Sequence, residues 1–501
     1  MPFISSTPPR FSSNTTKGLY IGKVEAEGEN NPGQGLKEYY EDYLNINNAL
    51  AEGKFIIVGR KGVGKSAYVK HLCDNSSLEN EILCDVVKND NISLHKILQL
   101  MPNEIENKAC LIYEWIILTE FVKLLLSNEN LKYSNGYDAL SKFQSINSGL
   151  VSLDKWMSVS ETTTKSFEVN FYPLKKAFPL NFAKHLEHPQ SKAPFYRIIP
   201  SLREIVVQML AYEANIGINF IVLFDDLDVH FNLRSVEQKS ELMDLIRVAR
   251  DYNTKYFPNQ NIKVVLMLRD DIAMQLDGIA PDKNKIFSSY EYKLQWYEAD
   301  KDMSDEYSKL RQFINRRIKI GLNKIGIDAK GKDPWSVLVN NAKSLDYKGK
   351  TAFKYILDYT FYRPRDFVAF FKDIGEYSYK LPLNSDCIKS LVTRYVNWNA
   401  QEIKDELTNL YSKEQINDLF KLLKKVADMS GGVRYEDIIN MMSECNLTIE
   451  DFENLVYYNY LIPNNGDIQY FSYREADRVG NWEDYTYSLP KGLYHYFKQR
   501  V

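Results

Sequence analysis

The sequence lacks the cysteine and histidine spacings that mark a disulfide framework or a zinc site. Its five cysteines are scattered along 501 residues with no C-x-x-C pair, a pattern that suits a reducing compartment. The one close pair among six histidines, His185 and His188, lies beside Pro189, which is more typical of a surface loop than of a metal ligand set. These spacings argue against a disulfide-rich secreted protein and against a structural zinc protein.

The sequence also lacks an excess of charge of one sign and a long uncharged hydrophobic run. The formal net charge is −3, so there is no overall basic field to attract nucleic acid or an anionic membrane. Residues 1–18 are rich in Ser, Thr and Pro without the apolar stretch of a signal peptide, and we expect a flexible leader. The most apolar segment, 109–126, contains three charged residues, which indicates a buried helix rather than a membrane span. We therefore expect a cytoplasmic protein without a membrane segment.

The alternation of apolar and amphipathic segments predicts an α/β fold in residues 19–300. Residues 37–50 have the spacing of an amphipathic helix, and short apolar runs separated by helical patterns follow. A continuous apolar run is typical of a parallel strand buried on both faces. We predict five such strands, at 55–58, 82–87, 220–224, 264–268 and 290–296. Because residues 87 and 220 are too far apart for an ordinary crossover, we also expect an insertion at about 128–197.

The C-terminal part of the chain has a different organisation. Helical spacing dominates residues 301–398, which we interpret as a helical lid. In residues 399–501, three expected helices precede two aromatic-rich strands, at 413–427, 435–445, 449–460, 468–473 and 485–489. Three helices followed by a hairpin predict a winged-helix domain.

A glycine-rich loop directly after the first strand carries the strongest chemical signal. Its G-x-x-x-x-G-K-S motif consists of Gly59, Arg60, Lys61, Gly62, Val63, Gly64, Lys65 and Ser66, and Ala67 continues into a helix. The glycines permit the bends that turn successive N–H groups towards a phosphate, and a helix N-terminus favours the anion. Lys65 can bind the β- and γ-phosphates, and the Ser66 hydroxyl can bind Mg²⁺. The loop therefore predicts a site for a nucleoside triphosphate with Mg²⁺.

Carboxylates follow the third predicted strand, in the run Phe224-Asp225-Asp226-Leu227-Asp228. Asp225, at the strand end, can hold Mg²⁺ through water. An acid directly after it can polarise an attacking water, which is the task of a general base. Asp226 is the first choice for that role and Asp228 the alternate. A solvated strand end is the other interpretation, and the glycine-rich loop makes it the weaker one.

Arginines follow the fourth predicted strand and open a predicted lid helix. Arg269 can reach a γ-phosphate and so detect its presence, although a surface salt bridge with Asp270 or Asp271 is the alternative. The run Arg363-Pro364-Arg365-Asp366 has proline and an acid where a helix begins, so it can be a helix cap. An arginine that projects from such a lid helix can instead contact the nucleotide.

These four elements, in this order, resemble the AAA+-related P-loop ATPases of the STAND and origin-recognition-like type. Similar bacterial ATPases begin with a Gly-Arg-Lys-Gly-x-Gly-Lys-Ser/Thr loop and end in a winged helix, and several are encoded among phage-defence genes. The resemblance implies a five-stranded parallel core of the AAA+ or ASCE type, ATP and Mg²⁺ as cofactors, and assembly into homo-oligomers. It implies a sensor role for Arg269 and a lid-sensor role for Arg365, with Arg363 as the alternative. It also implies an arginine that acts on a neighbouring subunit, for which Arg316 and Arg317 are the candidates.

Three functions are compatible with these motifs. No Ser/His/Asp set, nuclease-like carboxylate cluster or thiol with an evident base stands out in the sequence. We therefore expect an ATP hydrolase that controls assembly and an effector protein in anti-phage defence. A protein that binds nucleotide without turnover is one alternative, because aspartates 226 and 228 are shorter than the glutamate common at the catalytic position.

A nucleic-acid-binding loader is the other alternative, and charge argues against it. Residues 401–501 contain 11 Lys plus Arg and 17 Asp plus Glu, so their balance is 11 − 17 = −6. The predicted helix 449–460, which would enter the groove of duplex DNA, carries acids and no basic residue. We expect this domain to contact protein rather than nucleic acid.

Overall fold

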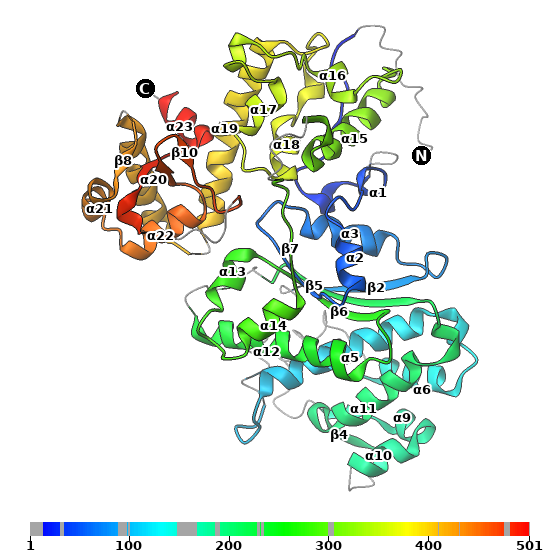
Figure 1. Ribbon diagram of the computed structural model, residues 1–501. Helices are drawn as coiled ribbons and strands as arrows, with labels where there is room; N and C mark the ends of the chain where they lie inside the picture. Colours follow the sequence, from blue (N-terminus) through cyan, green and yellow to red (C-terminus); the bar gives the residue numbers. More distant parts are fainter. Residues whose placement is uncertain are drawn as a thin grey trace, which may run out of the picture. The chain divides into compact units, whose positions relative to one another are not determined.

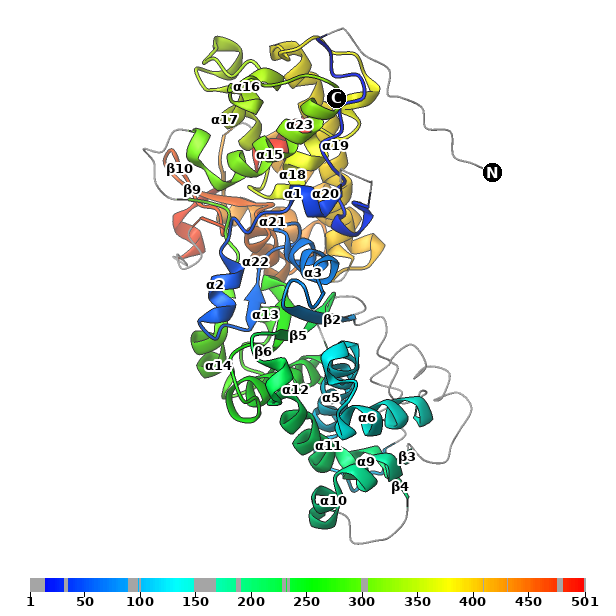
Figure 2. The same cartoon turned by 90° about the vertical axis from the view of Figure 1, so that its right-hand side faces the viewer.

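The described residues of the chain form two compact units (Figures 1 and 2). The computed structural model describes residues 14–30, 35–88, 98, 101–147, 168–185, 191–227, 231, 235–298, 305–408, 410–429, 431–474 and 481–499. The first unit consists of the described residues within Met1–Leu44, Gly62–Gly64 and Gln295–Val501. The second unit consists of the described residues within Asn45–Lys61 and Lys65–Leu294. Three residues of the glycine-rich loop thus belong to the first unit, and the rest of that loop belongs to the second.

A five-stranded parallel sheet is the centre of the second unit (Figure 1). The strand order is β2-β5-β6-β1-β7, with β1 at Ile56–Val58, β2 at Ile82–Lys88, β5 at Asn219–Asp225, β6 at Ile262–Leu268 and β7 at Glu291–Lys293. Every neighbouring pair is parallel, so all five strands end at the same edge. The predicted α/β fold with five parallel strands is confirmed, although β7 is shorter than the apolar run that predicted it.

The central strands β5 and β6 are mostly apolar because helices cover both faces of the sheet. β5 and β6 each bury six of their seven residues. The helices α2 (Ile46–Ala51) and α3 (Lys65–Asp74) lie on one side of the sheet, and α5 (Lys108–Ser127) and α12 (Val236–Asp251) on the other (Figure 1). Such burial on both faces is the usual environment of a parallel sheet.

Helix α5 is the buried helix that the sequence predicts at 109–126. Its Glu120 is 1 % exposed, and both carboxylate oxygens accept hydrogen bonds from Lys123, at 2.7 and 2.9 Å. Within the residues that the structure describes, no helix combines the length and the apolar character needed to cross a membrane.

A helical extension of the second unit packs against α5 through α11. It contains four helices and a two-stranded antiparallel sheet: α6 (Asn135–Ile146), β3 (Glu168–Asn170), α9 (Tyr172–Ala177), α10 (Pro179–His185), β4 (Lys192–Pro194) and α11 (Phe195–Leu210). Where it is described, the insertion expected at about 128–197 is therefore largely helical. Residues 148–167 and 186–190, with His188 among them, lie outside the described residues.

The prediction of one helix over residues 37–50 is wrong. The chain forms two short helices there, α1 (Leu36–Tyr39) and α2, because Tyr40 is extended and Asn45 has the left-handed angles φ 55° and ψ 38°. The apolar spacing nevertheless marked buried positions, since Tyr39, Ile46 and Leu50 are at most 5 % exposed. Spacing identified the buried face but not the break in the backbone.

Helices make up most of the first unit. Along the chain, five of them come after the last strand of the parallel sheet and before the C-terminal residues: α15 (Lys309–Lys324), α16 (Pro334–Leu338), α17 (Ala352–Leu357), α18 (Pro364–Phe370) and α19 (Ser385–Leu407). The fully buried indole of Trp335 is at their centre and makes edge contacts with the rings of Phe353, Phe367 and Phe371. Helix α19 is continuous across residue 398, where the sequence suggested the end of the lid.

The C-terminal residues that the structure describes combine four α-helices with a four-stranded antiparallel sheet. The elements are α20 (Lys413–Asp428), β8 (Val433–Arg434), α21 (Tyr435–Ser443), α22 (Ile449–Tyr457), β9 (Ile462–Asn465), β10 (Ile468–Gln469), β11 (Thr486–Ser488) and α23 (Lys491–Lys498). The three predicted helices are present. The predicted pairing of 468–473 with 485–489 is wrong, because β10 pairs with β9, and β11 pairs with β9 and β8. The turn between β9 and β10 contains Gly466 at φ 60°.

A buried ion pair fixes the N-terminal residues to α15. The Nη1 and Nη2 atoms of Arg317 lie 2.6 and 3.0 Å from the two carboxylate oxygens of Glu29, and the residues are 5 % and 1 % exposed. Because Arg317 is buried in this pair, it is a poor candidate for an arginine that would act on a neighbouring subunit. Arg316, whose side chain is 40 % exposed, stays the candidate.

We expect Glu29→Ala to lower the free energy of unfolding by about 3–5 kcal/mol, because it leaves the charge of Arg317 buried without its partner. Urea denaturation followed by circular dichroism measures the change. The matched control is Glu41→Ala, which removes the exposed partner of Arg316 at 3.4 Å and should cost less than about 1 kcal/mol. Equal losses in the two variants would contradict the assignment.

Candidate functional site

Residues of the predicted site meet at one edge of the parallel sheet. Gly59 follows β1, Asp225 ends β5, and Arg269 follows β6, which lies between the other two strands. The Gly59 N–H donates a hydrogen bond to the carbonyl oxygen of Leu268 at 3.1 Å, so β1 and β6 stay paired to their ends. In open α/β sheets, ligands bind outside the carboxyl ends of the strands. The fold thus brings the loop, an acid and an arginine to the edge where a ligand is expected.

The glycine-rich loop (Gly59–Ser66) joins β1 to α3, as the sequence predicts. Gly62 and Gly64 have φ angles of 84° and 107°, in a region that other residues rarely adopt. The Lys65 ammonium donates to the carbonyl oxygens of Gly59 at 2.5 Å and Arg60 at 3.3 Å. The loop therefore curls around its own lysine and places a positive charge inside the bend.

The residues after the loop's bend begin the ten-residue helix α3. The first N–H groups of a helix have no acceptor within it and carry partial positive charge, which suits a phosphate. Ala67, the third residue of α3, contributes only its backbone to this end. In the first unit, the carbonyl of buried Val63 accepts a hydrogen bond from the Trp296 indole N–H at 2.8 Å, which helps to fix the bend of the loop.

Asp225 is a buried carboxyl group of the site with a raised pKa. It is 2 % exposed, and the Ser66 hydroxyl of the loop is hydrogen-bonded to it. Burial, followed by the charge of Asp226, raises the pKa of Asp225 to about 6. Among the described residues its Oδ2 atom is buried with no hydrogen-bond partner.

An unpartnered buried carboxylate oxygen is costly, and a bound cation would compensate that cost. The oxygen donors of Ser66 and Asp225, one from the loop and one from β5, are the hard ligands that Mg²⁺ prefers. Magnesium usually takes only one or two protein ligands beside water and phosphate oxygens. The chemistry of Ser66 and Asp225 therefore fits their predicted role as Mg²⁺ ligands.

Asp226 differs from Asp225 in conformation and exposure. Its φ of 54° is uncommon for a residue other than glycine. Its side chain is 34 % exposed and forms an ion pair with Lys88, with 3.1 Å between Nζ and Oδ2. The alternate base, Asp228, lies outside the described residues. Of the two adjacent acids, Asp226 is thus the one whose carboxylate water can reach.

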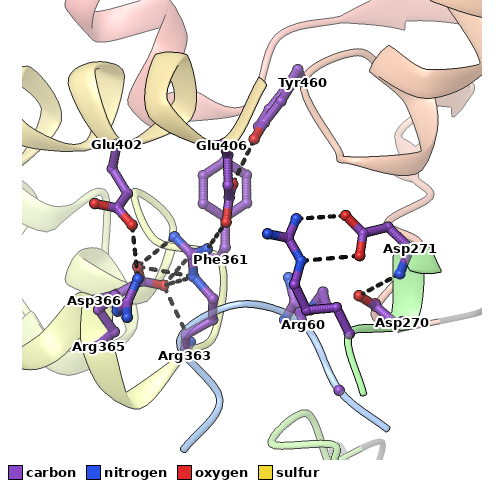
Figure 3. A network of polar contacts seen from close by, with 12 residues as sticks. Arg60, Asp270, Asp271, Phe361, Arg363, Arg365, Asp366, Glu402, Glu406 and Tyr460 are labelled. Carbon is purple, nitrogen blue, oxygen red and sulfur yellow. Dashed lines mark hydrogen bonds and ion pairs between the residues drawn. The ribbon is translucent and has the colours of Figure 1, made fainter. Parts of the chain in front are cut away.

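Arg269 is buried and fully engaged with an acid. It is 6 % exposed, and its Nε and Nη2 atoms lie 3.0 and 2.5 Å from the two carboxylate oxygens of Asp271. The salt bridge that was the alternative to a sensor role is present, although it is buried and not on the surface. Burial and the neighbouring Asp271 raise the pKa of Asp270, and the positive charges of Arg60 and Lys65 oppose this rise. Figure 3 shows Asp270, Asp271 and Arg60 in this region. The positive charges of the glycine-rich loop therefore act on the pKa of Asp270.

The two arginines at the start of α18 have different environments (Figure 3). Arg363 is 4 % exposed and forms ion pairs with Asp366 at 3.0 Å and with Glu406 of α19 at 3.5 Å. Asp366 in turn accepts from the backbone N–H of Arg363, which completes a helix cap. Arg365 is 21 % exposed at its side chain, and its Nη1 donates to Glu402 of α19 at 2.8 Å. Arg363 caps the helix, and Arg365 is the one with solvent access.

The sequence analysis did not identify three residues that form ion pairs with the candidate site residues. They are Lys88, which pairs with Asp226, Glu402, which pairs with Arg365, and Glu406, which pairs with Arg363. Lys88 ends β2 at the same sheet edge as Asp225, so its position after an apolar run was a usable signal. Glu402 and Glu406 are four residues apart and share one helix face, but the helix predicted at this place was not expected to extend to them.

The chain is thus an α/β protein with a five-stranded parallel sheet and a helical segment that carries two arginines at the start of α18. Residues 308–404 match the family described as the FunZ-associated C-terminal helical domain. The matched residues run from the start of α15 into α19, and they include Arg363, Arg365 and Glu402. No curated protein matches the chain.

Proposed function

We propose that this protein is an ATP-binding and ATP-hydrolysing switch that controls oligomeric assembly and a protein partner. One observation carries the proposal: the buried carboxylate of Asp225, hydrogen-bonded by Ser66 of the glycine-rich loop, has an oxygen that finds no hydrogen-bond partner among the residues that the structure describes. A structural carboxylate would be expected to have both oxygens satisfied. A pair of oxygen donors from two different elements, beside a loop that holds a lysine, is what a magnesium nucleotide needs.

The topology supports a core of the AAA+ or ASCE type. β6 lies between the strand that leads into the loop and the strand that ends in Asp225, and it delivers Arg269 to the same edge. This order is in keeping with the ASCE-type core that the sequence predicts. The antiparallel sheet β10-β9-β11-β8 with α20, α21 and α22 supports the winged-helix interpretation of the C-terminal residues in the same way.

Each site residue has a role in this proposal. The loop's N–H groups and Lys65 bind the phosphates, and Ser66 and Asp225 hold Mg²⁺, which neutralises phosphate charge when it is bound. Asp226 orients a water and accepts its proton, since it is the solvent-accessible acid next to Asp225. Arg269 contacts the terminal phosphate once it exchanges Asp271 for that anion.

The proposed setting is a bacterial defence system with an effector on a partner protein. The helical segment 308–404 supports it, because its family is linked to a defence-type gene context. The acidic C-terminal residues favour a protein partner: Glu450 and Glu453 of α22 are exposed, so this helix would repel the phosphates of DNA.

A second candidate is a switch that holds nucleotide without turning it over. Two observations favour it, the ion pair of Asp226 with Lys88 and that of Arg269 with Asp271. If both pairs persist around bound nucleotide, neither side chain is available to the reaction. The nucleotide would then act as a structural ligand.

Purified full-length protein tests the proposal in three measurements. We expect it to release phosphate from ATP in the presence of Mg²⁺, to change its mass in solution between ATP and ADP, and to show no salt-sensitive retention of duplex DNA. Binding of ATP without phosphate release would favour the second candidate. Failure to bind ATP at all would refute both, and DNA retention would favour a loader.

A further inference from the structure

Two cysteine side chains meet between the end of helix α3 and strand β2, within the second unit. The thiol of Cys84 donates a hydrogen bond to the sulfur of Cys73, with 3.8 Å between the two Sγ atoms. Cys73 is the last residue but one of α3, and Cys84 is the third residue of β2. The two elements lie side by side in Figures 1 and 2. The fold thus pairs two thiols that no sequence motif links.

Hydrogen bonds hold the backbone on the β2 side of this thiol pair. The Cys84 backbone N–H donates to the Ser76 hydroxyl at 3.0 Å, and that hydroxyl donates to the Cys84 carbonyl oxygen at 3.4 Å. Cys84 is also in register with Ile221 of the neighbouring strand β5. The sulfur atoms of a disulfide are about 2.05 Å apart, so bond formation requires an approach of about 1.8 Å. Changes in the two side-chain torsions can supply an approach of that size.

The hydrogen bond between the thiols gives the two sulfurs different chemistry. The bond donated by Cys84 lowers the pKa of Cys73, with support from Lys70, and it outweighs burial and the charges of Asp85 and Asp74. Hydrogen bonding to Cys73, followed by burial, raises the pKa of Cys84. Cys73 is partly exposed, whereas Cys84 is 8 % exposed. Because the thiolate is the reactive form, Cys73 is the sulfur that an oxidant meets first.

We propose that Cys73 and Cys84 are a redox-sensing pair that hydrogen peroxide converts to a disulfide and that a thiol reductant restores. The proposal goes beyond the proposed function and does not depend on it. Disulfides that form in reducing compartments are usually transient and redox-sensing, so the scattered cysteines of this chain are compatible with such a pair. The bond would tie the end of α3, the helix that begins with Lys65 and Ser66, to β2.

The disulfide forms in two steps. The Cys73 thiolate attacks one peroxide oxygen, so that an S–O bond forms, the O–O bond breaks and the departing hydroxide takes up a proton as water. The Cys84 sulfur then attacks the Cys73 sulfur, so that the S–S bond forms and the S–O bond breaks. The hydroxide released in this step leaves as water with the Cys84 proton. Two thiols are thus oxidised by two electrons, and one peroxide is reduced to two waters.

Peptide mapping of the peroxide-treated full chain tests the pair directly. Lys70 and Lys88 are consecutive cleavage points for trypsin, so both cysteines leave in one peptide, 71–88, and a disulfide removes two hydrogen atoms from its mass. Cleavage after Glu79 or Glu81 should then give fragments that separate only after reduction. We expect the thiols that react in denaturant to fall from five to three, and dithiothreitol to restore all five.

Three serine variants test the order of the steps. Cys84→Ser keeps a hydroxyl donor for Cys73 but cannot close the bond, so a Cys73 sulfenic acid should accumulate and be captured by dimedone. Cys73→Ser should abolish the oxidation of Cys84. The matched control is Cys110→Ser, because Cys110 is also partly buried in the second unit, and burial raises its pKa to about 12. This variant should form the disulfide as wild type does, and in wild type Cys110 should be oxidised at least about tenfold more slowly than Cys73.

Two results would overturn the proposal. One is a peptide 71–88 that keeps its reduced mass at a peroxide concentration that oxidises Cys110. The other is oxidation of Cys73 to sulfinic acid while Cys84 remains a thiol, since the second sulfur would then fail to close the bond. The mapping uses wild-type protein without nucleotide, so neither result depends on the folding of a variant or on ATP binding.

Discussion

Lys65→Ala is expected to abolish measurable phosphate release from ATP and to weaken ATP binding by on the order of a hundredfold. The Lys65 ammonium is held inside the loop by two carbonyl oxygens, at 2.5 and 3.3 Å, so it is already placed where a phosphate would accept from it. A charge-assisted hydrogen bond to a phosphate contributes about 3 kcal/mol at its upper range, which corresponds to about a hundredfold in affinity. Alanine removes that charge without altering the glycines that shape the loop.

Phosphate release and calorimetric titration with ATP measure the effect on purified full-length protein. The matched control is Lys70→Ala, which removes the same charge from the same helix but from a lysine paired with Asp74 at 2.9 Å. It should leave ATP binding unaffected and lower stability by less than about 1 kcal/mol. ATP affinity that is unchanged in Lys65→Ala would show that the glycine-rich loop does not bind phosphate here.

The parts of the fold that the sequence predicts well are those set by local pattern. The core strands are largely apolar, since helices cover both faces of the sheet, and the runs at 82–87, 220–224 and 264–268 predict β2, β5 and β6 to within two residues of their observed ends. The glycine-rich loop was equally visible, because Gly62 and Gly64 must be glycine for their φ angles. Apolar runs and glycines in a tight loop can be read from the local sequence, because they do not depend on a residue that is distant in the chain.

The parts that the sequence does not predict depend on tertiary contacts. The partner of Asp226 is Lys88, which is 138 positions earlier in the chain and becomes a neighbour only because β2 pairs with β5. The buried pairing of Arg269 with Asp271 was weighed as a surface salt bridge, since burial is not evident from a run of charged residues. The strand pairing of β11 with β9 and β8 was also missed, because short aromatic strands do not specify their neighbours.

A common feature of the candidate cations is that each is held by an acceptor of its own unit. Lys65 is bonded to loop carbonyls, Arg269 to Asp271 and Arg365 to Glu402. The acceptors differ in strength, from neutral carbonyls to a buried carboxylate that binds at two points. A polyphosphate should therefore displace the contacts of Lys65 most easily and those of Arg269 least easily. Under the proposed function, this order would suit Lys65 to initial binding and Arg269 to a later step that reports on the terminal phosphate.

Asp225→Asn is expected to lower phosphate release by at least about a hundredfold while it stabilises the nucleotide-free protein. The loss of activity follows from the loss of the carboxylate proposed to hold Mg²⁺. The gain in stability follows from burial, which raises the pKa of Asp225 from 3.8 to about 6. Above pH 6 the fold has to bury an ionised carboxylate, and the difference in pKa corresponds to about 3 kcal/mol at pH 8.

The sign of the pH dependence is specific to a carboxyl whose pKa is raised by folding. In the wild type, this group lowers the free energy of unfolding as the pH rises from about 4 to about 6, because the folded state holds its proton more tightly than the unfolded state. The gain from Asp225→Asn should thus be about 1–3 kcal/mol at pH 8 and should shrink towards zero near pH 4. Urea denaturation at pH 8, 6 and 5, without nucleotide or Mg²⁺, measures this gain in the free energy of unfolding.

The control Asp226→Asn alters an acid that is 34 % exposed and paired with Lys88, so it should change stability by less than about 1 kcal/mol. If Asp225→Asn were less stable than wild type at pH 8, the carboxylate would be a structural group of the fold and not a site kept for a cation.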